Sequence, residues 1–223
     1  MGLGHSPSIP MTNCILAVDA GNAKSYPGSG TTWTDLSGQS NTGTLTNGPT
    51  YSSGNGGYIA FDGTNDCVTI KSNTSVLSNS TYTKIAWCYF TSFSTGNNLI
   101  SGGNLGTNHA LFLQTSNRVY AGHNGSWSTV QSSSTLSLNT WYMIGVTFNT
   151  TSGWVIYING VSDGTSASTT AFTGGQGELL LGAYGTGANV LTGRMAAAFV
   201  YNQVLTAAEM LQHFNALRGR FGL

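Results

Sequence analysis

Charged residues are scarce in this chain of 223 residues: Asp, Glu, Lys and Arg make up only 6%, and the net charge is +0. In a typical soluble domain, about a quarter of the residues are charged. The seven basic residues are scattered singly, so the sequence offers no basic face that could neutralise nucleic-acid phosphates. We therefore predict that nucleic acid is not a partner. A surface with so little charge is weakly protected against association, which favours a protein covered by partners.

Long apolar runs are also missing. No run approaches the roughly 20 residues of a membrane span, which argues against a membrane partner. The first apolar run, residues 15–18, is too short for a signal peptide, and no basic region precedes it. The cysteines are few, odd in number and far apart, which favours buried free thiols over disulfides: Cys14, Cys67 and Cys88. We expect synthesis in a reducing cytoplasm, without a signal peptide.

Catalytic patterns are sparse as well. Retaining glycoside hydrolysis needs two carboxyl groups about 5–5.5 Å apart, but Glu178 and Glu209 are far apart in sequence, and no Glu-x-Asp-x-Glu pattern exists. No serine lies in a Gly-x-Ser-x-Gly context. The histidines stand alone, without the spacing of metal ligands: His5, His109, His123 and His213. We predict that the protein is not an enzyme and requires no cofactor.

Polarity comes instead from Ser, Thr, Asn and 31 Gly, while 39% hydrophobic residues are enough to fill a core. This composition favours short strands with tight turns over a helical bundle. Apolar alternation between turn signals predicts an all-β, two-sheet antiparallel sandwich or jelly roll. The predicted strands cover residues 14–20, 58–61, 67–70, 81–93, 99–101, 110–114, 118–123, 128–131, 141–148, 154–159, 178–182 and 194–201.

The clearest strand signal is the stretch 141–160. Its two alternating segments are joined by the polar residues 149–153, an ordinary length for a hairpin loop. Large apolar side chains occur on both faces, so we expect this hairpin near the centre of its sheet and covered on both sides.

One short helix is predicted near the C-terminus. Thr206 and Glu209 form a capping box, and Leu205 can pack on Met210 as a hydrophobic staple. Gly219 is the expected stop signal. The predicted apolar stripe consists of Met210, Leu211, Phe214 and Leu217.

The N-terminal residues 1–13 show no periodicity and contain Pro7 and Pro10. They predict an extended arm, held either by the domain itself or by a neighbour. Residues 14–223 contain no repeat or linker and are predicted to form one domain.

Several short segments, in their order and spacing, resemble one family over roughly residues 14–220. They are LAVDAGN at 16–22, DLSG at 35–38, NGP at 47–49, FDGTND at 61–66, YING at 157–160, GRMA at 193–196 and YNQVLT at 201–206. The pattern resembles the LamG-like branch of the concanavalin A-like lectin/glucanase superfamily, whose fold is a two-sheet β-jelly roll.

The N-terminal GHSPSI and the stretch 16–38 are similar to virion proteins of tailed phages, notably those that infect cyanobacteria. This similarity implies a structural protein at the virion surface, either a capsid decoration or tail-associated. Its partners would be major capsid or tail proteins, and a homo-oligomer is an open alternative. The expected docking residues lie in the arm: His5, Pro7, Ile9 and Pro10. The alternative function is an adhesin that binds host-surface glycans.

The resemblance to LamG-like domains implies calcium at the rim of the sandwich. Asp62, Asn65 and Asp66 lie on one tight turn and could supply some of the six to eight oxygens that calcium takes. The alternative is that these side chains make Asx-type hydrogen bonds within the turn.

Glycan binding requires exposed aromatic rings beside polar groups. The candidates are Tyr26, Trp127 and Tyr184, and Trp127, within HNGSW at 123–127, is the most suggestive. Aromatic residues are equally the usual anchors of protein interfaces.

Overall fold

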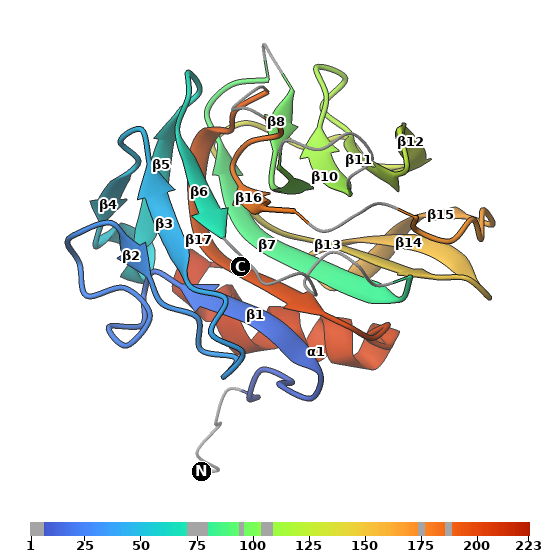
Figure 1. Ribbon diagram of the computed structural model, residues 1–223, viewed down its shortest axis with the longest axis horizontal. Helices are drawn as coiled ribbons and strands as arrows, with labels where there is room; N and C mark the ends of the chain where they lie inside the picture. Colours follow the sequence, from blue (N-terminus) through green and yellow to red (C-terminus); the bar gives the residue numbers. More distant parts are fainter. Residues whose placement is uncertain (1–6, 71–79, 94–95, 104–108, 174–176, 186–188) are drawn as a thin grey trace.

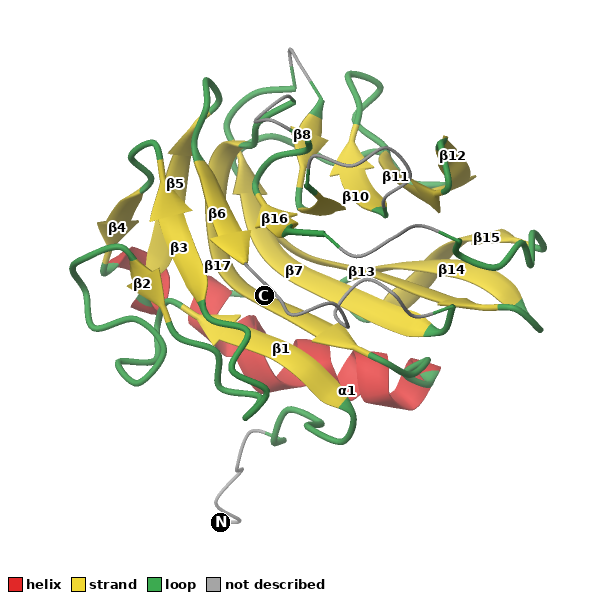
Figure 2. Ribbon diagram, viewed as in Figure 1, coloured by secondary structure: helices red, strands yellow, loops and turns green. Residues whose placement is uncertain are grey.

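The computed structural model describes residues 7–70, 80–93, 96–103, 109–173, 177–185 and 189–223. Antiparallel strands dominate these residues and pack as two layers, with helix α1 (Ala207–Leu217) against the outside of one layer (Figures 1 and 2). The all-β sandwich with one C-terminal helix is therefore confirmed. Nowhere in the described part of the chain is a helix long and apolar enough to cross a membrane.

The first layer is the larger sheet, in which β17 also pairs with β1 (Cys14–Asp19). Its strands follow in the order β15 (Val161–Ser166), β14 (Gly153–Ile158), β13 (Trp141–Asn149), β7 (Tyr82–Phe90), β17 (Thr192–Tyr201), β5 (Tyr58–Asp62) and β4 (Thr50–Ser52).

The second layer consists of two smaller sheets. One runs β2 (Thr32–Trp33), β3 (Gly43–Thr46), β6 (Cys67–Ile70), β16 (Leu179–Leu181) and β9 (Ile100–Gly102); the other runs β12 (Ser126–Gln131), β11 (Val119–His123), β10 (Ala110–Leu113) and β8 (Asn97–Asn98). They adjoin where the Leu99 amide donates to the Leu111 carbonyl and the Gly102 amide to the His109 carbonyl, each at 2.9 Å.

The predicted hairpin is confirmed as β13 and β14. Both strands are internal, because β7 pairs with the far side of β13 and β15 with the far side of β14. Ile144, Val146 and Phe148 point into the core between the layers, whereas Trp141 and Met143 face the helix side. Successive side chains of a strand point to opposite faces of the sheet, so this one strand contributes to two apolar clusters.

Helix α1 begins at the predicted capping box, with the Thr206 hydroxyl accepting from the Glu209 amide at 3.2 Å. The predicted stripe is wrong at Leu211, which is 45% exposed, while His213 is fully buried. Positions 210, 213, 214 and 217 follow the helical period, and 211 falls outside this face. Helix α1 ends at Leu217 with Arg218 as its C-cap, directly before the predicted stop at Gly219, and the chain continues as the 3₁₀ helix η2 (Arg218–Phe221).

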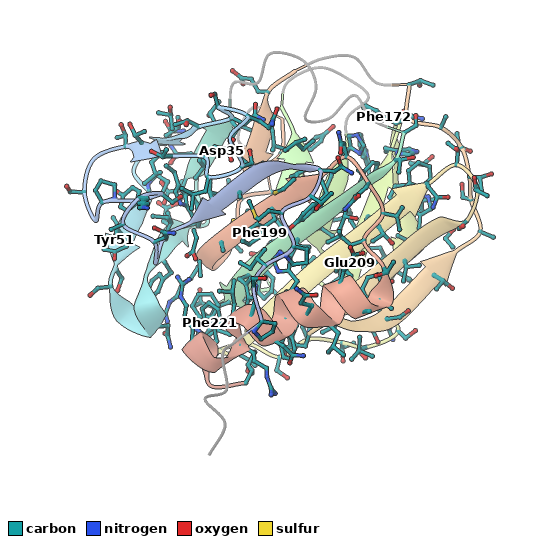
Figure 3. The ribbon with its side chains drawn as sticks, turned by 90° about the horizontal axis from the view of Figure 1, so that it is seen from below. Asp35, Tyr51, Phe172, Phe199, Glu209 and Phe221 are labelled. Atoms are coloured by element: carbon teal, nitrogen blue, oxygen red, sulfur yellow. The ribbon has the colours of Figure 1, made fainter. Side chains whose placement is uncertain are left out.

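The outer face of the large sheet is covered by this helical segment. The Trp87 ring stacks on Phe214 and on Phe221, at centroid distances of 5.7 and 4.6 Å. Figure 3, which looks onto this side, shows Glu209 and Phe221 at opposite ends of the helical segment. A Cβ on Gly145 would lie 2.4 Å from Met210 Cε, so glycine permits the close contact of helix and sheet.

Several strands were missed by the sequence pattern. Residues 21–50 contain β2 and β3 and begin β4, and the last strand of the β13–β15 meander, β15, carries mostly polar residues. A third helical piece is the short η1 (Gly54–Gly56). The three cysteines are buried free thiols, as predicted.

The described part of the arm lies against its own domain. Ile9 packs on the apolar cluster between the large sheet and α1, which includes Trp141 and Met143. The Pro10 carbonyl accepts from the Tyr201 hydroxyl and the Ser8 carbonyl from Gln212 Nε2, each at 2.8 Å. Pro7 is exposed. His5, the remaining predicted docking residue, lies outside the described residues.

Candidate functional site

Trp127 is positioned by the tight hairpin between β11 and β12. Asn124 and Gly125 form its two-residue turn, with φ of 55° and 85°, and positive φ at both residues is what a type I′ turn requires. Beside the turn, a Cβ on Gly122 would lie 1.8 Å from the Ser126 carbonyl oxygen. The Asn-Gly turn and this glycine together determine where the Trp127 side chain leaves the strand.

Trp127 meets Tyr184, which follows β16 in the other small sheet. Their ring centroids lie 5.3 Å apart with an interplanar angle of 65°, and both side chains are half-buried. The two rings line a cleft of about 240 Å³, the aromatic cleft. The other described residues that line it are Asn98, Ala110, Phe112, Gln114, Ser128 and Asn189.

Amide side chains supply the polar part of the aromatic cleft. Asn98 is buried, and its amide is held because Nδ2 donates to the Asn189 carbonyl at 3.1 Å and Oδ1 accepts from the Ser101 hydroxyl at 2.7 Å. Gln114 Nε2 donates to the Ser128 hydroxyl at 3.4 Å. Amides and hydroxyls carry both donors and acceptors, so the cleft can bind ligand hydroxyl groups in either role.

A second cleft, of about 540 Å³, adjoins the first at Ser128. We call it the hydroxyl cleft because side chains with hydroxyl groups dominate its lining. Its described residues are His123, Asn124, Ser126, Ser128, Thr129, Ser168 and Thr170.

The far wall of the hydroxyl cleft is tied to the β11–β12 turn by Asn124. The Asn124 side chain donates to the Ala171 carbonyl at 2.7 Å and accepts from the Thr173 amide at 2.9 Å. Next to these bonds, Phe172 is buried against His109 and His123. The segment after β15 is therefore held at a fixed distance from β12.

His123 lies beneath the hydroxyl cleft with only 3% of its surface exposed. Its Nε2 lies 2.9 Å from the Thr170 carbonyl oxygen; since a carbonyl only accepts, Nε2 carries the proton and Nδ1 accepts from the Tyr82 hydroxyl at 3.2 Å. Burial lowers the pKa of His123, against the opposing effect of the Thr170 carbonyl. Both ring nitrogens hold the fold together, and neither is left to take a proton from a substrate.

None of the described residues that line the two clefts is charged. Three of the carboxylates have structural partners elsewhere: Asp19 pairs with Arg220 at 2.6 Å, the Asp35 carboxylate accepts from the Ala17 amide at 2.8 Å, and Glu209 caps α1. The clefts therefore offer hydrogen bonds and apolar contact but no acid–base pair.

The turn predicted to bind calcium makes internal hydrogen bonds. Asp62 Oδ1 accepts from the Thr64 amide at 2.7 Å, and Asp66 Oδ2 accepts from the Asp62 amide at 3.0 Å. Burial raises the pKa of Asp66. The Asn65 carbonyl accepts from Asn47 Nδ2 at 2.8 Å. Within the described ranges no cluster of three or more His, Cys, Asp or Glu could hold a metal, and calcium stays a prediction.

Tyr26 lies apart from the clefts. It is 4% exposed, its hydroxyl donates to the Gly30 carbonyl at 2.6 Å, and its ring packs on Tyr51 at a centroid distance of 5.1 Å. A ring buried in this way cannot stack on a sugar, so the structure excludes it as the exposed platform that the sequence predicted.

A family model described as the concanavalin A-like lectin/glucanases superfamily matches residues 62–210, which is more than half of the chain. The chain belongs to this superfamily. The resemblance seen in the sequence is confirmed at that level. A search of curated proteins finds no match.

Three solved structures are similar to this chain over most of its length. A Trypanosoma rangeli sialidase has a TM-score of 0.70 at 14% identity over 96% of this chain, which spans 34% of the sialidase. Domain 4 of AbnA, a Geobacillus stearothermophilus arabinanase, in complex with arabinotriose, has a TM-score of 0.70 at 16% identity, covering 90% of this chain and 98% of that one. A structure of botulinum neurotoxin type C, whose cell entry is described as dependent upon interaction with two ganglioside molecules, has a TM-score of 0.66 at 13% identity. The match covers 93% of this chain and 52% of the neurotoxin chain. These likenesses show the fold.

Some cleft residues carried no signal in the sequence. Asn98, Phe112 and Asn189 come from β8, β10 and the loop before β17, and they meet only because the second layer brings these segments together. Trp127 and Tyr184 were candidates in the sequence because they are aromatic residues in turn-rich segments, a signal that Tyr26 shares.

Proposed function

We propose that this chain is a non-catalytic carbohydrate-binding protein whose binding surface is the aromatic cleft. The observation that carries the proposal is the pair of half-buried rings, Trp127 and Tyr184, beside uncharged amides. The faces of aromatic rings are electronegative and attract the weakly positive C–H groups of a sugar. The amides of Gln114 and Asn189 would bond its hydroxyl groups.

The relatives support this proposal. Domain 4 of AbnA was solved with arabinotriose bound and is matched over nearly its whole length, and the neurotoxin structure is described by its interaction with gangliosides. A shared fold alone does not assign a function, so the argument rests on the cleft.

Absence of catalysis is part of the proposal. Hydrolysis of a glycosidic bond commonly uses two carboxyl groups on either side of the bond, and the clefts show none among their described lining residues. His123 is committed to Tyr82 and Thr170.

The test is a glycan array followed by calorimetry on the glycans that bind. Trp127→Ala and Tyr184→Ala should each weaken binding by about tenfold or more, the loss expected for an anchor side chain. Tyr58→Ala is the matched control, since Tyr58 is a half-buried ring on β5 that packs on the α1 side of the large sheet and lines neither cleft. The affinity of this control variant for the glycan should be unchanged.

The proposal fails if no glycan on the array binds, or if both cleft variants bind as the unmodified protein does. Circular dichroism and thermal unfolding of each variant distinguish lost binding from lost folding.

We also propose that the protein acts at the surface of a phage virion, where its arm docks on capsid or tail proteins. The observation in favour is the position of the arm: Ser8, Pro10 and Thr12 are bonded to the domain, whereas Pro7 is exposed and accessible to a partner.

Deletion of residues 1–7 tests this second proposal, because it keeps the contacts of Ser8 and Pro10 with the domain. The truncated protein should fold but be missing from purified particles. Unchanged occupancy on the particle would rule out docking through the arm.

A further inference from the structure

From the two adjoining clefts we infer that the ligand is a neutral oligosaccharide of at least two sugar units, which lies across both clefts with Ser128 at the junction. This inference rests on the proposed carbohydrate-binding function and specifies its ligand class.

The volumes of the clefts argue for more than one sugar unit. The aromatic cleft, at about 240 Å³, is smaller than the roughly 300–1,000 Å³ of typical small-molecule sites. The hydroxyl cleft adds about 540 Å³ on the other side of Ser128. A ligand that fills only the aromatic cleft would leave the larger, more polar space to water.

The two clefts differ in chemistry in the way that successive sugar units would use. Trp127 and Tyr184 offer apolar ring surface to one unit, whereas Ser126 and Ser168 present hydroxyl groups to the next. Ser128, exposed on β12, lines both clefts and can bond to either unit. Hydroxyl groups act as donor and acceptor, which suits a neutral polyol.

The lack of charge argues against an acidic glycan. Residues 92–131 and 166–192 supply every described lining residue, and only Arg118 and Glu178 are charged in these stretches. The Arg118 guanidinium already donates to the Ser132 carbonyl at 2.7 Å and to the Ser133 carbonyl. A sugar carboxylate would lose hydration in the clefts without gaining a cationic partner, which is unfavourable.

A length series tests the number of units. Mono-, di- and trisaccharides of the neutral sugar selected on the array are titrated by calorimetry. We expect affinity to rise by about tenfold or more from the first to the third member, since each added unit makes new hydrogen bonds.

A charge series tests neutrality. Oligosaccharides of the same length, with one sugar unit replaced by its uronic acid, should bind about tenfold more weakly or worse, because their carboxylate is desolvated without a partner. Equal or tighter binding of the acidic series would overturn the neutral assignment.

A double variant, Ser126→Ala with Ser168→Ala, tests the hydroxyl cleft. It should weaken trisaccharide binding by about fivefold to tenfold, as expected for lost hydrogen bonds, and leave monosaccharide binding unchanged. The matched control is Thr151→Ala with Ser152→Ala in the exposed β13–β14 loop, which should change neither.

The outcomes separate the two proposals. If the trisaccharide binds no better than the monosaccharide and Trp127→Ala abolishes both, the ligand occupies the aromatic cleft alone; the inference fails and the proposed function stands. If the double variant binds the trisaccharide normally, the hydroxyl cleft is not used and the inference also fails. If no glycan binds, both fail.

Discussion

The Tyr82 hydroxyl lies 3.2 Å from Nδ1 of His123, and this buried contact joins the middle of the sandwich to the floor of the hydroxyl cleft. On its other side His123 bonds to the Thr170 carbonyl, which lies in the far wall of the cleft. The imidazole therefore links β7, β11 and the segment after β15. Together with the two hydrogen bonds of Asn124, this buried pair holds the shape of the surface site.

Tyr82→Phe should lower the free energy of unfolding by about 1–3 kcal/mol, because it leaves Nδ1 of the buried His123 without its donor. Urea unfolding measures the change. Tyr120→Phe is the control, since the contact of the Tyr120 hydroxyl among the described residues is the exposed Ser116 hydroxyl; it should have almost no effect. Equal losses in the two variants would contradict the role given to the buried bond.

Lys84→Met should stabilise the protein at neutral pH. Lys84 is 1% exposed, and its Nζ has the Ile100 carbonyl at 3.2 Å and the Tyr82 ring as its contacts among the described residues. Burial lowers the pKa of Lys84 well below 10.5. Below pH 10.5 the unfolded chain therefore binds a proton that the folded chain does not, and stability falls as pH decreases.

The variant has no such group, so its advantage over the unmodified protein should grow as pH falls from about 10 to 7, by up to about 1.4 kcal/mol per pH unit. Denaturant unfolding across this range measures the difference. Lys24→Met, at an exposed position, should show no pH-dependent difference. A constant difference for Lys84→Met would mean that the folded protein keeps this lysine protonated.

His213 should make the protein sensitive to acid. It is fully buried beside Tyr201, with Nε2 3.1 Å from the hydroxyl, and burial lowers its pKa from 6.5 to about 3. As pH falls from 6.5 towards 3, the unfolded chain gains a proton that the folded chain rejects, so stability is lost within this window. His213→Leu should reduce the slope of the free energy of unfolding against pH by up to about 1.4 kcal/mol per pH unit. Parallel pH profiles of the two proteins would refute this origin.

Calcium binding at the turn of residues 62–66 predicts a measurable heat on titration and a higher melting temperature. Asp62 and Asp66 each use one carboxylate oxygen for a turn amide, which leaves the other for a cation that takes six to eight oxygens. Asp62→Asn should abolish both signals, while Asp163→Asn, whose carboxylate bonds Ser134 instead, should preserve them. No heat and no thermal shift in the unmodified protein would end the calcium hypothesis.

Local features were predictable wherever neighbouring residues determine the structure. The Thr206–Glu209 capping box and the β13–β14 hairpin are such cases. Strands 161–166 and 43–46 were missed because they contain few apolar residues and receive their order from the partners they pair with. Leu211 was misplaced because the helical stripe shifted to include His213, a polar residue that no hydrophobicity pattern selects.

The sequence by itself determined the all-β fold and the faces of β13, because apolar alternation acts over a few residues. Only the tertiary structure decided that Trp127 meets Tyr184, that Tyr26 is buried and that Lys84 lies in the core. These contacts join segments far apart in the chain, and their positions follow from the order of strands in the sheets rather than from any local preference.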